Sequence, residues 1–264
     1  MVRVNPLRLA SPLPVALAML AAAPAQAGEV ACRFERGVIT VPAEVAGIAG
    51  DYILDTGAAQ TTLHETNAQA NGVAETALTG EVRLAGLAAP GVAMKVADLD
   101  IRTWNLPTPA AGVIGADALK GFVVDVDYAP CRVRVSPAGK APRFSGRRYD
   151  LGWDLGRPTA RAAVSDDAHR ISGRFVIATG ANVPVRLADD LAQGSAETKE
   201  LYPEGAWLAR LPEVDFGGAR GRDVAAGLMK PEGEVVGLLG GQVLAHFHLR
   251  FDFPAGRLLV DPVR

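Results

Sequence analysis

The sequence predicts an all-β protein built from two copies of one folding unit. Short apolar runs rich in Val, Leu and Ile recur along the chain, and 29 glycines and 18 prolines interrupt them. This pattern is typical of many short strands joined by turns. No long helix is evident after residue 27, and two blocks of internal similarity indicate the duplication.

The longer block aligns residues 113–137 with residues 238–262, without a gap, at an offset of 125. Its identical pairs are spread over the whole block: Gly115 with Gly240, Leu119 with Leu244, Phe122 with Phe247, Asp127 with Asp252, Arg132 with Arg257, Val135 with Val260, and Pro137 with Pro262. The shorter block aligns residues 52–58 with residues 175–181, at an offset of 123. Two separate blocks with nearly the same offset indicate a duplicated unit.

The duplication divides the chain into two lobes. The first copy spans residues 28–137 and the second spans residues 149–264. Between them, residues 138–148 are rich in Pro, Gly, Ser and basic residues, which predicts an exposed linker. Alternating patterns predict a strand at residues 38–45 and again at 160–164. Each copy is expected to close with a hairpin, over residues 123–135 and 248–260.

The first 27 residues have the features of a secretory signal peptide. Arg3 and Arg8 precede an apolar run, and Ala25-Gln26-Ala27 offers a cleavage site of small residues. The run is too short for a membrane span, so we expect an exported protein, periplasmic or secreted, with no stable membrane insertion after cleavage. Losing these two arginines takes the net charge from −2 to −4, which argues against nucleic acid partners.

Cys32 and Cys131 are the two cysteines of the chain. Because an exported protein meets an oxidising compartment, we expect a disulfide between them, the alternative being two buried free thiols. Neither cysteine belongs to a metal-binding pattern, and the pair His246 and His248 lacks a third ligand nearby in sequence. We therefore expect no metal site. His64 is expected to flank the Asp-Thr-Gly turn described below without a catalytic role.

The sequence Leu54-Asp55-Thr56-Gly57-Ala58, followed by residues 61–63 and later by Val113-Ile114-Gly115, resembles the retropepsin-like aspartic proteases. An aspartate at such a turn projects its carboxylate outward, and Gly57 allows the backbone to bend closely. The resemblance implies two pseudo-symmetric β-barrel lobes facing a central cleft. It also implies catalytic roles for Asp55, Thr56 and Gly57, with no cofactor and no metal.

The second copy departs from this pattern. Ala178 stands where the partner aspartate belongs, although Thr179 and Gly180 remain, so this second site is degenerate. In the family two facing carboxylates share a proton, and alanine cannot hold one.

Three interpretations follow. Two chains could pair Asp55 with Asp55 as a homodimer through lobe 1, giving an active endopeptidase for exported proteins or peptides. Alternatively, the chain is a pseudoprotease that binds extended peptides, or a structural factor.

The stretch at residues 82–92 has the pattern of a hairpin and lies between the turn and Val113-Ile114-Gly115. We expect it to cover the cleft as a lid with Gly86 near its tip, the alternative being an ordinary surface hairpin. The expected substrate-binding residues are largely apolar: Ala58, Leu84, Gly86, Leu87 and Ile114. Such walls favour extended apolar peptide segments as ligands.

Overall fold

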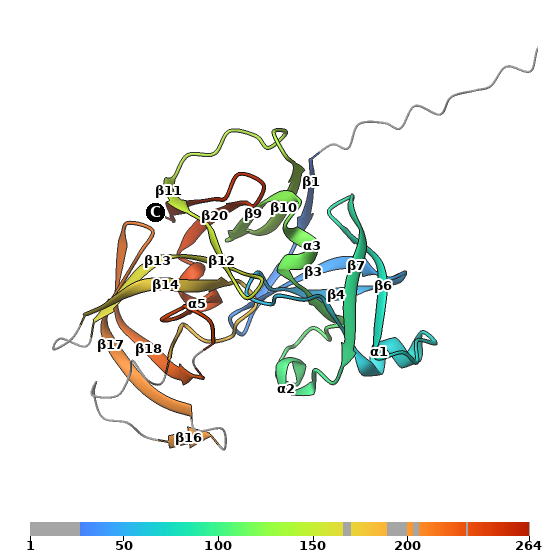
Figure 1. Ribbon diagram of the computed structural model, residues 1–264, viewed down its shortest axis with the longest axis horizontal. Coiled ribbons are helices and arrows are strands. Elements are labelled where there is room, and N and C mark those ends of the chain that lie inside the picture. Colours follow the sequence, from blue (N-terminus) through green and yellow to red (C-terminus); the bar gives the residue numbers. More distant parts are fainter. Residues whose placement is uncertain (1–26, 166–169, 189–199, 203–205, 231, 264) are drawn as a thin grey trace, which may run out of the picture.

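The computed structural model describes residues 27–165, 170–188, 200–202, 206–230 and 232–263. The expected signal peptide lies outside these residues, apart from Ala27. The described chain forms two lobes side by side, one built from each copy of the repeat (Figure 1). Among the described residues, no helix is long and apolar enough to cross a membrane.

Lobe 1 is a closed barrel of six strands. The strands follow the order β3-β4-β8-β5-β7-β6, and pairing of β3 with β6 closes the barrel, while β2 extends the edge at β3. The bounds of these strands are Arg33–Glu35 (β2), Val38–Val45 (β3), Ile48–Leu54 (β4), Thr62–His64 (β5), Ala77–Leu84 (β6), Leu87–Ala97 (β7) and Gly112–Ile114 (β8). Three short helices lie in the connections: Glu65–Ala70 (α1), Asp100–Thr103 (α2) and Ala116–Leu119 (α3).

Lobe 2 repeats this plan. Its barrel follows the order β13-β14-β19-β15-β18-β17 and is closed by pairing of β13 with β17, with β12 and β16 as additional strands. The bounds are Gly152–Asp154 (β12), Arg157–Ser165 (β13), Arg170–Ala178 (β14), Val185–Ala188 (β15), Glu200–Tyr202 (β16), Ala206–Phe216 (β17), Ala219–Met229 (β18), Gly237–Gly240 (β19) and Gly241–Leu244 (α5). In both lobes the strand before the Asp-Thr-Gly or Ala-Thr-Gly turn (β4 or β14) pairs in parallel with the short strand at the start of the longer repeat block (β8 or β19).

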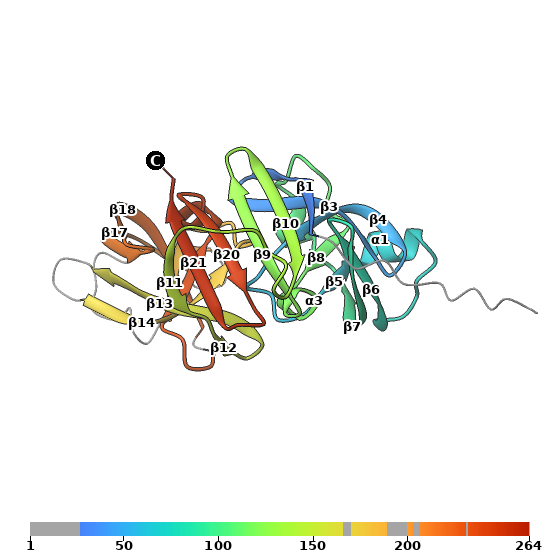
Figure 2. The same ribbon diagram turned by 90° about the horizontal axis from the view of Figure 1, so that it is seen from above.

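A third sheet joins the two lobes. Its six strands are β1 (Gly28–Ala31), β10 (Cys131–Pro137), β9 (Phe122–Tyr128), β20 (Phe247–Asp252), β21 (Arg257–Pro262) and β11 (Arg147–Asp150). The closing hairpins of the two copies therefore lie side by side, with β9 paired antiparallel to β20 (Figure 2). The expected linker is largely exposed, although its last two residues already belong to β11.

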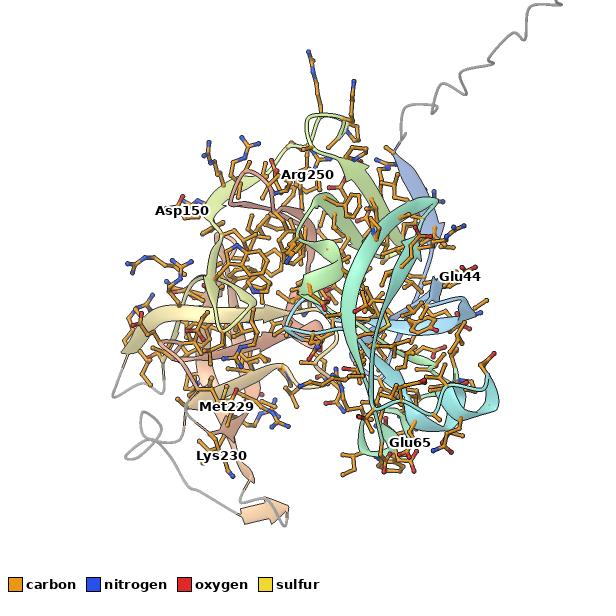
Figure 3. All side chains as sticks on the ribbon, turned by 45° about the vertical axis from the view of Figure 1, so that its right-hand side comes forward. Glu44, Glu65, Asp150, Met229, Lys230 and Arg250 are labelled. Atoms are coloured by element: carbon orange, nitrogen blue, oxygen red, sulfur yellow. A yellow bond between two sulfur atoms is a disulfide. The ribbon has the colours of Figure 1, made fainter. Side chains whose placement is uncertain are left out.

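Side-chain alternation explains why these hairpins pair in one sheet. In β10, Val133 and Val135 point into the core, whereas Arg132 and Arg134 lie on the other face and bind Glu29 of β1. At the centre of the sheet Arg250, labelled in Figure 3, donates two hydrogen bonds to Asp125 across the β9–β20 pair. Their side chains are 9% and 16% exposed, so a largely buried charge pair links the copies. Because two guanidinium nitrogens bind the two oxygens of one carboxylate, this bidentate pair also fixes how β9 and β20 align.

The expected disulfide is present. Cys32 and Cys131 are bonded with an S–S distance of 2.06 Å and are separated by 99 residues. The bond lies where β1 runs antiparallel to β10, so it ties the first strand of copy one to its closing hairpin.

We predict that this disulfide contributes about 2–4 kcal/mol to the free energy of unfolding, because it closes a long loop in the unfolded chain. Urea unfolding of Cys32→Ser/Cys131→Ser should show this loss. The unmodified protein should show a similar loss when reductant is added, whereas the variant should not respond. Equal stability with and without reductant would contradict the prediction.

Candidate active site

Asp55 lies in a turn directly after β4. Its backbone N–H donates to the carbonyl of Ile114 at 3.0 Å, which continues the parallel β4–β8 pairing by one residue. The turn closes through a hydrogen bond from Ala58 N to Asp55 O at 3.2 Å. The Asp55 side chain is 7% exposed. The strand thus delivers the carboxylate to one fixed, nearly buried position.

Thr56 and Thr179 bind the two turns to each other. The backbone N–H of Thr56 donates to the hydroxyl of Thr179 at 3.1 Å, and the N–H of Thr179 donates to the hydroxyl of Thr56 at 3.3 Å. Each hydroxyl also donates to a carbonyl of the opposite lobe: Thr56 to Ile177, and Thr179 to Leu54 at 2.7 Å. Both threonines are fully buried. We call these four bonds the threonine grip.

The grip brings the Asp-Thr-Gly and Ala-Thr-Gly turns face to face. A Cβ at Gly57 would come within 2.4 Å of the Cβ of Ala178, and a Cβ at Gly180 within 2.4 Å of the Cβ of Asp55. Only glycine permits this approach from both sides. The grip forms within one chain, so the two turns that face each other belong to the two copies of one chain.

Backbone donors from both copies hold one oxygen of Asp55. Oδ1 accepts from the N–H of Gly57 at 2.8 Å and from the N–H of Gly180 at 3.2 Å. Tyr128, at the end of β9 in the interlobe sheet, senses this charge. Its burial and, to a smaller extent, the negative charge of Asp55 raise the pKa of its hydroxyl. The structure thus brings Asp55, Thr56 and Gly57, which sequence analysis assigned to the site, together in one turn against Gly180 of copy two.

The other oxygen of Asp55 is bound by Arg102, which sequence analysis missed. Arg102 Nη2 lies 2.7 Å from Asp55 Oδ2 and 3.2 Å from the carbonyl oxygen of Gly180. It comes from α2, on the side of lobe 1 that faces lobe 2 (Figure 1). A guanidinium thus lies against the carboxylate, whereas the residue of copy two that aligns with Asp55, Ala178, offers only a methyl group.

Apolar packing holds α2 beside the turn. Leu99 precedes the helix and Leu106 follows it, and both are buried in a small cluster with Ile53 of β4 and Val113 of β8. The one signal in the sequence is that Arg102 is the only basic residue between Lys95 and Lys120. That signal does not place it near Asp55.

The expected lid and most of the expected cleft wall are corrected by the structure. Leu84, Leu87 and Ile114 are 4%, 6% and 0% exposed and belong to the hydrophobic core. The hairpin does form, with its turn at Ala85 and Gly86, but its tip packs against β1, where a Cβ at Gly28 would lie 1.6 Å from the carbonyl oxygen of Ala85.

The hairpin is therefore an ordinary part of the barrel wall and does not cover Asp55. Its strand β6 is needed to close the barrel through β3, and this pairing sets Leu84 opposite Ala43, with the leucine side chain in the interior. Of the expected wall residues, Ala58 does lie at the turn, half-buried against the cluster that holds α2.

We predict that Thr56→Ala lowers the free energy of unfolding by about 1–3 kcal/mol, because it leaves the Ile177 carbonyl and the Thr179 N–H buried without a partner. Thr56→Ser, which keeps the hydroxyl, should cost less. In the double variant Thr56→Ala/Thr179→Ala, the loss of free energy of unfolding should differ from the sum of the two single losses by at least about 0.5 kcal/mol. Thr79→Ala, on the exposed face of β6, is the control. Losses that are additive and as small as in this control would show that the grip contributes little to stability.

Comparison with known proteins agrees with this geometry. Residues 41–124, which contain the Asp55 turn and β8, match the model of the aspartyl protease family. The fold is similar to the crystal structure of the aspartic proteinase from Irpex lacteus, with 12% sequence identity and a TM-score of 0.54 over 90% of this chain and 97% of that chain. No curated protein sequence matches the chain. The chain thus has the two-lobed retropepsin/pepsin-like aspartic protease fold, with a first lobe that matches the aspartyl protease family.

Proposed function

We propose that the protein is an exported pseudoprotease that binds extended peptides where its two lobes meet and does not cleave them by the aspartic mechanism. The observation that carries this proposal is the contact between Arg102 and Asp55. A guanidinium lies against Asp55, and Ala178 stands at the position that carries the second carboxylate of an aspartic protease.

The chemistry of the site follows from this substitution. In an aspartic protease one carboxylate takes a proton from water while its partner donates one. Ala178 has no proton to donate, and a guanidinium remains protonated at any ordinary pH, so Arg102 cannot exchange one. Loss of a positioned acid or base typically costs a factor of about 10² to 10⁴ in rate. The site is therefore suited to holding a ligand more than to hydrolysing it.

Exposed apolar side chains near the site support a binding role. Ile101 and Trp104, which flank Arg102, are 80% and 77% exposed. Leu155, in the turn between β12 and β13, is 65% exposed, and the next residue, Gly156, faces Ala59 beside the Asp55 turn. Each lobe thus has large exposed apolar side chains close in sequence to residues of the site, and such side chains are typical of recognition surfaces.

A hollow of about 560 Å³ extends this surface along lobe 1. It begins at Ala59 and Gln60, directly after the turn, and continues between α3 and the first part of β7. Val92 and Phe122 offer apolar contacts there, while Asp117 and Lys120 offer charges. A peptide that runs past the turn would find both kinds of partner in this hollow.

The disulfide supports the proposed export, because such bonds persist in oxidising compartments such as the periplasm or the extracellular space. The ligand is then an exported protein or peptide. The negative charge expected after removal of the signal peptide disfavours nucleic acid.

One observation favours a second function, an aspartic endopeptidase. Asp55 Oδ1 keeps both backbone donors, from Gly57 and from Gly180, so the aspartate half of a catalytic site is intact. In this alternative, α2 withdraws with Arg102 to admit water. The matched family consists of peptidases, and cleavage that depends on Asp55 would establish this function.

We predict that an unstructured peptide rich in Leu and Val binds without being cleaved and shifts the fluorescence of Trp104 to shorter wavelength. Trp104→Ala should weaken binding about tenfold, because it removes an aromatic anchor. A tenfold change corresponds to about 1.4 kcal/mol of binding free energy. Trp153→Phe is the control, because Trp153 packs on Phe253 of lobe 2. Absence of any binding would favour a structural factor. Cleavage that Asp55→Asn abolishes would favour the endopeptidase.

We also predict that Arg102→Gln/Ala178→Asp creates acid-pH peptidase activity at least about tenfold above that of either single variant, because only the double variant has two carboxylates free of the guanidinium. Cleavage of an unfolded protein at about pH 4 measures this. Adding Asp55→Asn should abolish the gain. A folded double variant that stays inactive would show that Ala178 does not occupy the position of the missing acid.

A further inference from the structure

We propose that His64, Asp98 and Asp100 form a binding site for a divalent transition-metal ion, for which zinc is the best chemical match. The three residues come together from the end of β5, the loop after β7 and the start of α2. The site is separate from Asp55, and the inference holds whether or not the protein binds peptides.

The ligand atoms are already close enough for one ion. One donor atom from each residue lies within 4.8 Å of the other two, and His64 Nε2 is 3.1 Å from Asp100 Oδ1. Bond lengths of about 2.0–2.2 Å to nitrogen and oxygen place tetrahedral zinc ligands roughly 3.3 Å apart. Small rotations of the two exposed aspartates would complete this geometry.

The burial of His64 is an independent indication of a ligand. Its side chain is 9% exposed, and Nε2 points to Asp100, so this nitrogen is the one that would bind the ion. In copy two the equivalent position is Leu187, which is 1% exposed and lies in the core. The fold therefore accepts a leucine here, and copy one instead buries an imidazole whose Nε2 faces a carboxylate.

The surrounding groups suit a cation. The backbone N–H of Asp100 donates to Asp98 Oδ1 at 2.7 Å, which orients that carboxylate as outer-shell contacts of metal ligands commonly do. Arg102, the basic residue nearest in sequence, is already paired with Asp55. One imidazole and two carboxylates are a ligand set that zinc accepts, with a fourth position for water. Among the described residues, this is the only such group of three.

An ion at this site would also fix α2. Asp98 and Asp100 bracket Leu99, the residue that anchors the helix, and Asp100 lies two positions before Arg102. The metal would therefore hold the segment that places the guanidinium on Asp55. Zinc binding and the position of Arg102 would then be linked.

Isothermal titration of the metal-stripped protein with zinc tests the proposal. We expect one ion per chain, and at least a tenfold loss of affinity in Asp98→Asn/Asp100→Asn. His64→Leu, which installs the residue found at the equivalent position of copy two, should fold and lose the site. The matched control Glu75→Gln/Glu234→Gln, which removes two exposed acids elsewhere, should bind as the unmodified protein does. Cobalt should give the absorption of a tetrahedral complex.

Three outcomes would overturn the inference. They are no zinc binding at millimolar concentration, binding that His64→Leu and Asp98→Asn/Asp100→Asn leave unchanged, and binding that is lost in His246→Asn/His248→Asn. The last would assign the ion to the other pair of histidines. Because the readout is metal binding, failure here would leave the proposed peptide binding untouched, and failure of peptide binding would leave this site untouched.

Discussion

The threonine grip is the interaction on which the rest of the site depends. It joins two short turns through four hydrogen bonds at residues that solvent does not reach. Each backbone N–H and each hydroxyl in it finds its partner in the opposite lobe, so neither turn is satisfied alone. Buried polar groups that lose their partners are costly, which makes the face-to-face arrangement of the lobes obligatory.

Copy two keeps the scaffold of the turn without its acid. Copy two keeps Thr179 and Gly180, which the grip and the close approach to Asp55 require, and has an alanine at the position that would carry the acid. Arg102 then supplies the group that faces Asp55. Because Leu99 and Leu106 anchor its helix in the barrel wall, the guanidinium is held in place by packing as well as by charge. The same short segment carries Asp100 and so touches the proposed metal site.

Much of the fold could be predicted because its signals are local or repeated. The repeat predicted two similar lobes, and its longer block predicted the closing hairpins, which form the centre of the interlobe sheet. The disulfide pairing followed from there being only two cysteines. The Asp55 turn was recognised from contiguous residues. Its partner turn was found because the repeat aligned it.

Contacts between distant residues could not be predicted in the same way. Arg102 is 47 positions from Asp55, and no periodic pattern connects them. The stretch at residues 82–92 alternates as a lid would, but it alternates equally as a barrel strand. Pairing of β6 with β3 decides between these alternatives and places Leu84 in the core. His64 looked like a flanking residue because its neighbours Asp98 and Asp100 are more than 30 positions away.

The central claim is that a guanidinium, and not a water molecule between two acids, occupies the position opposite Asp55. A crystal structure of the unmodified protein grown at acidic pH tests it most directly. We expect Arg102 within hydrogen-bonding distance of Asp55 Oδ2, with Leu99 packed against Ile53 and Val113. An α2 displaced from the site, with an ordered water bound to Asp55 beside Ala178, would contradict it.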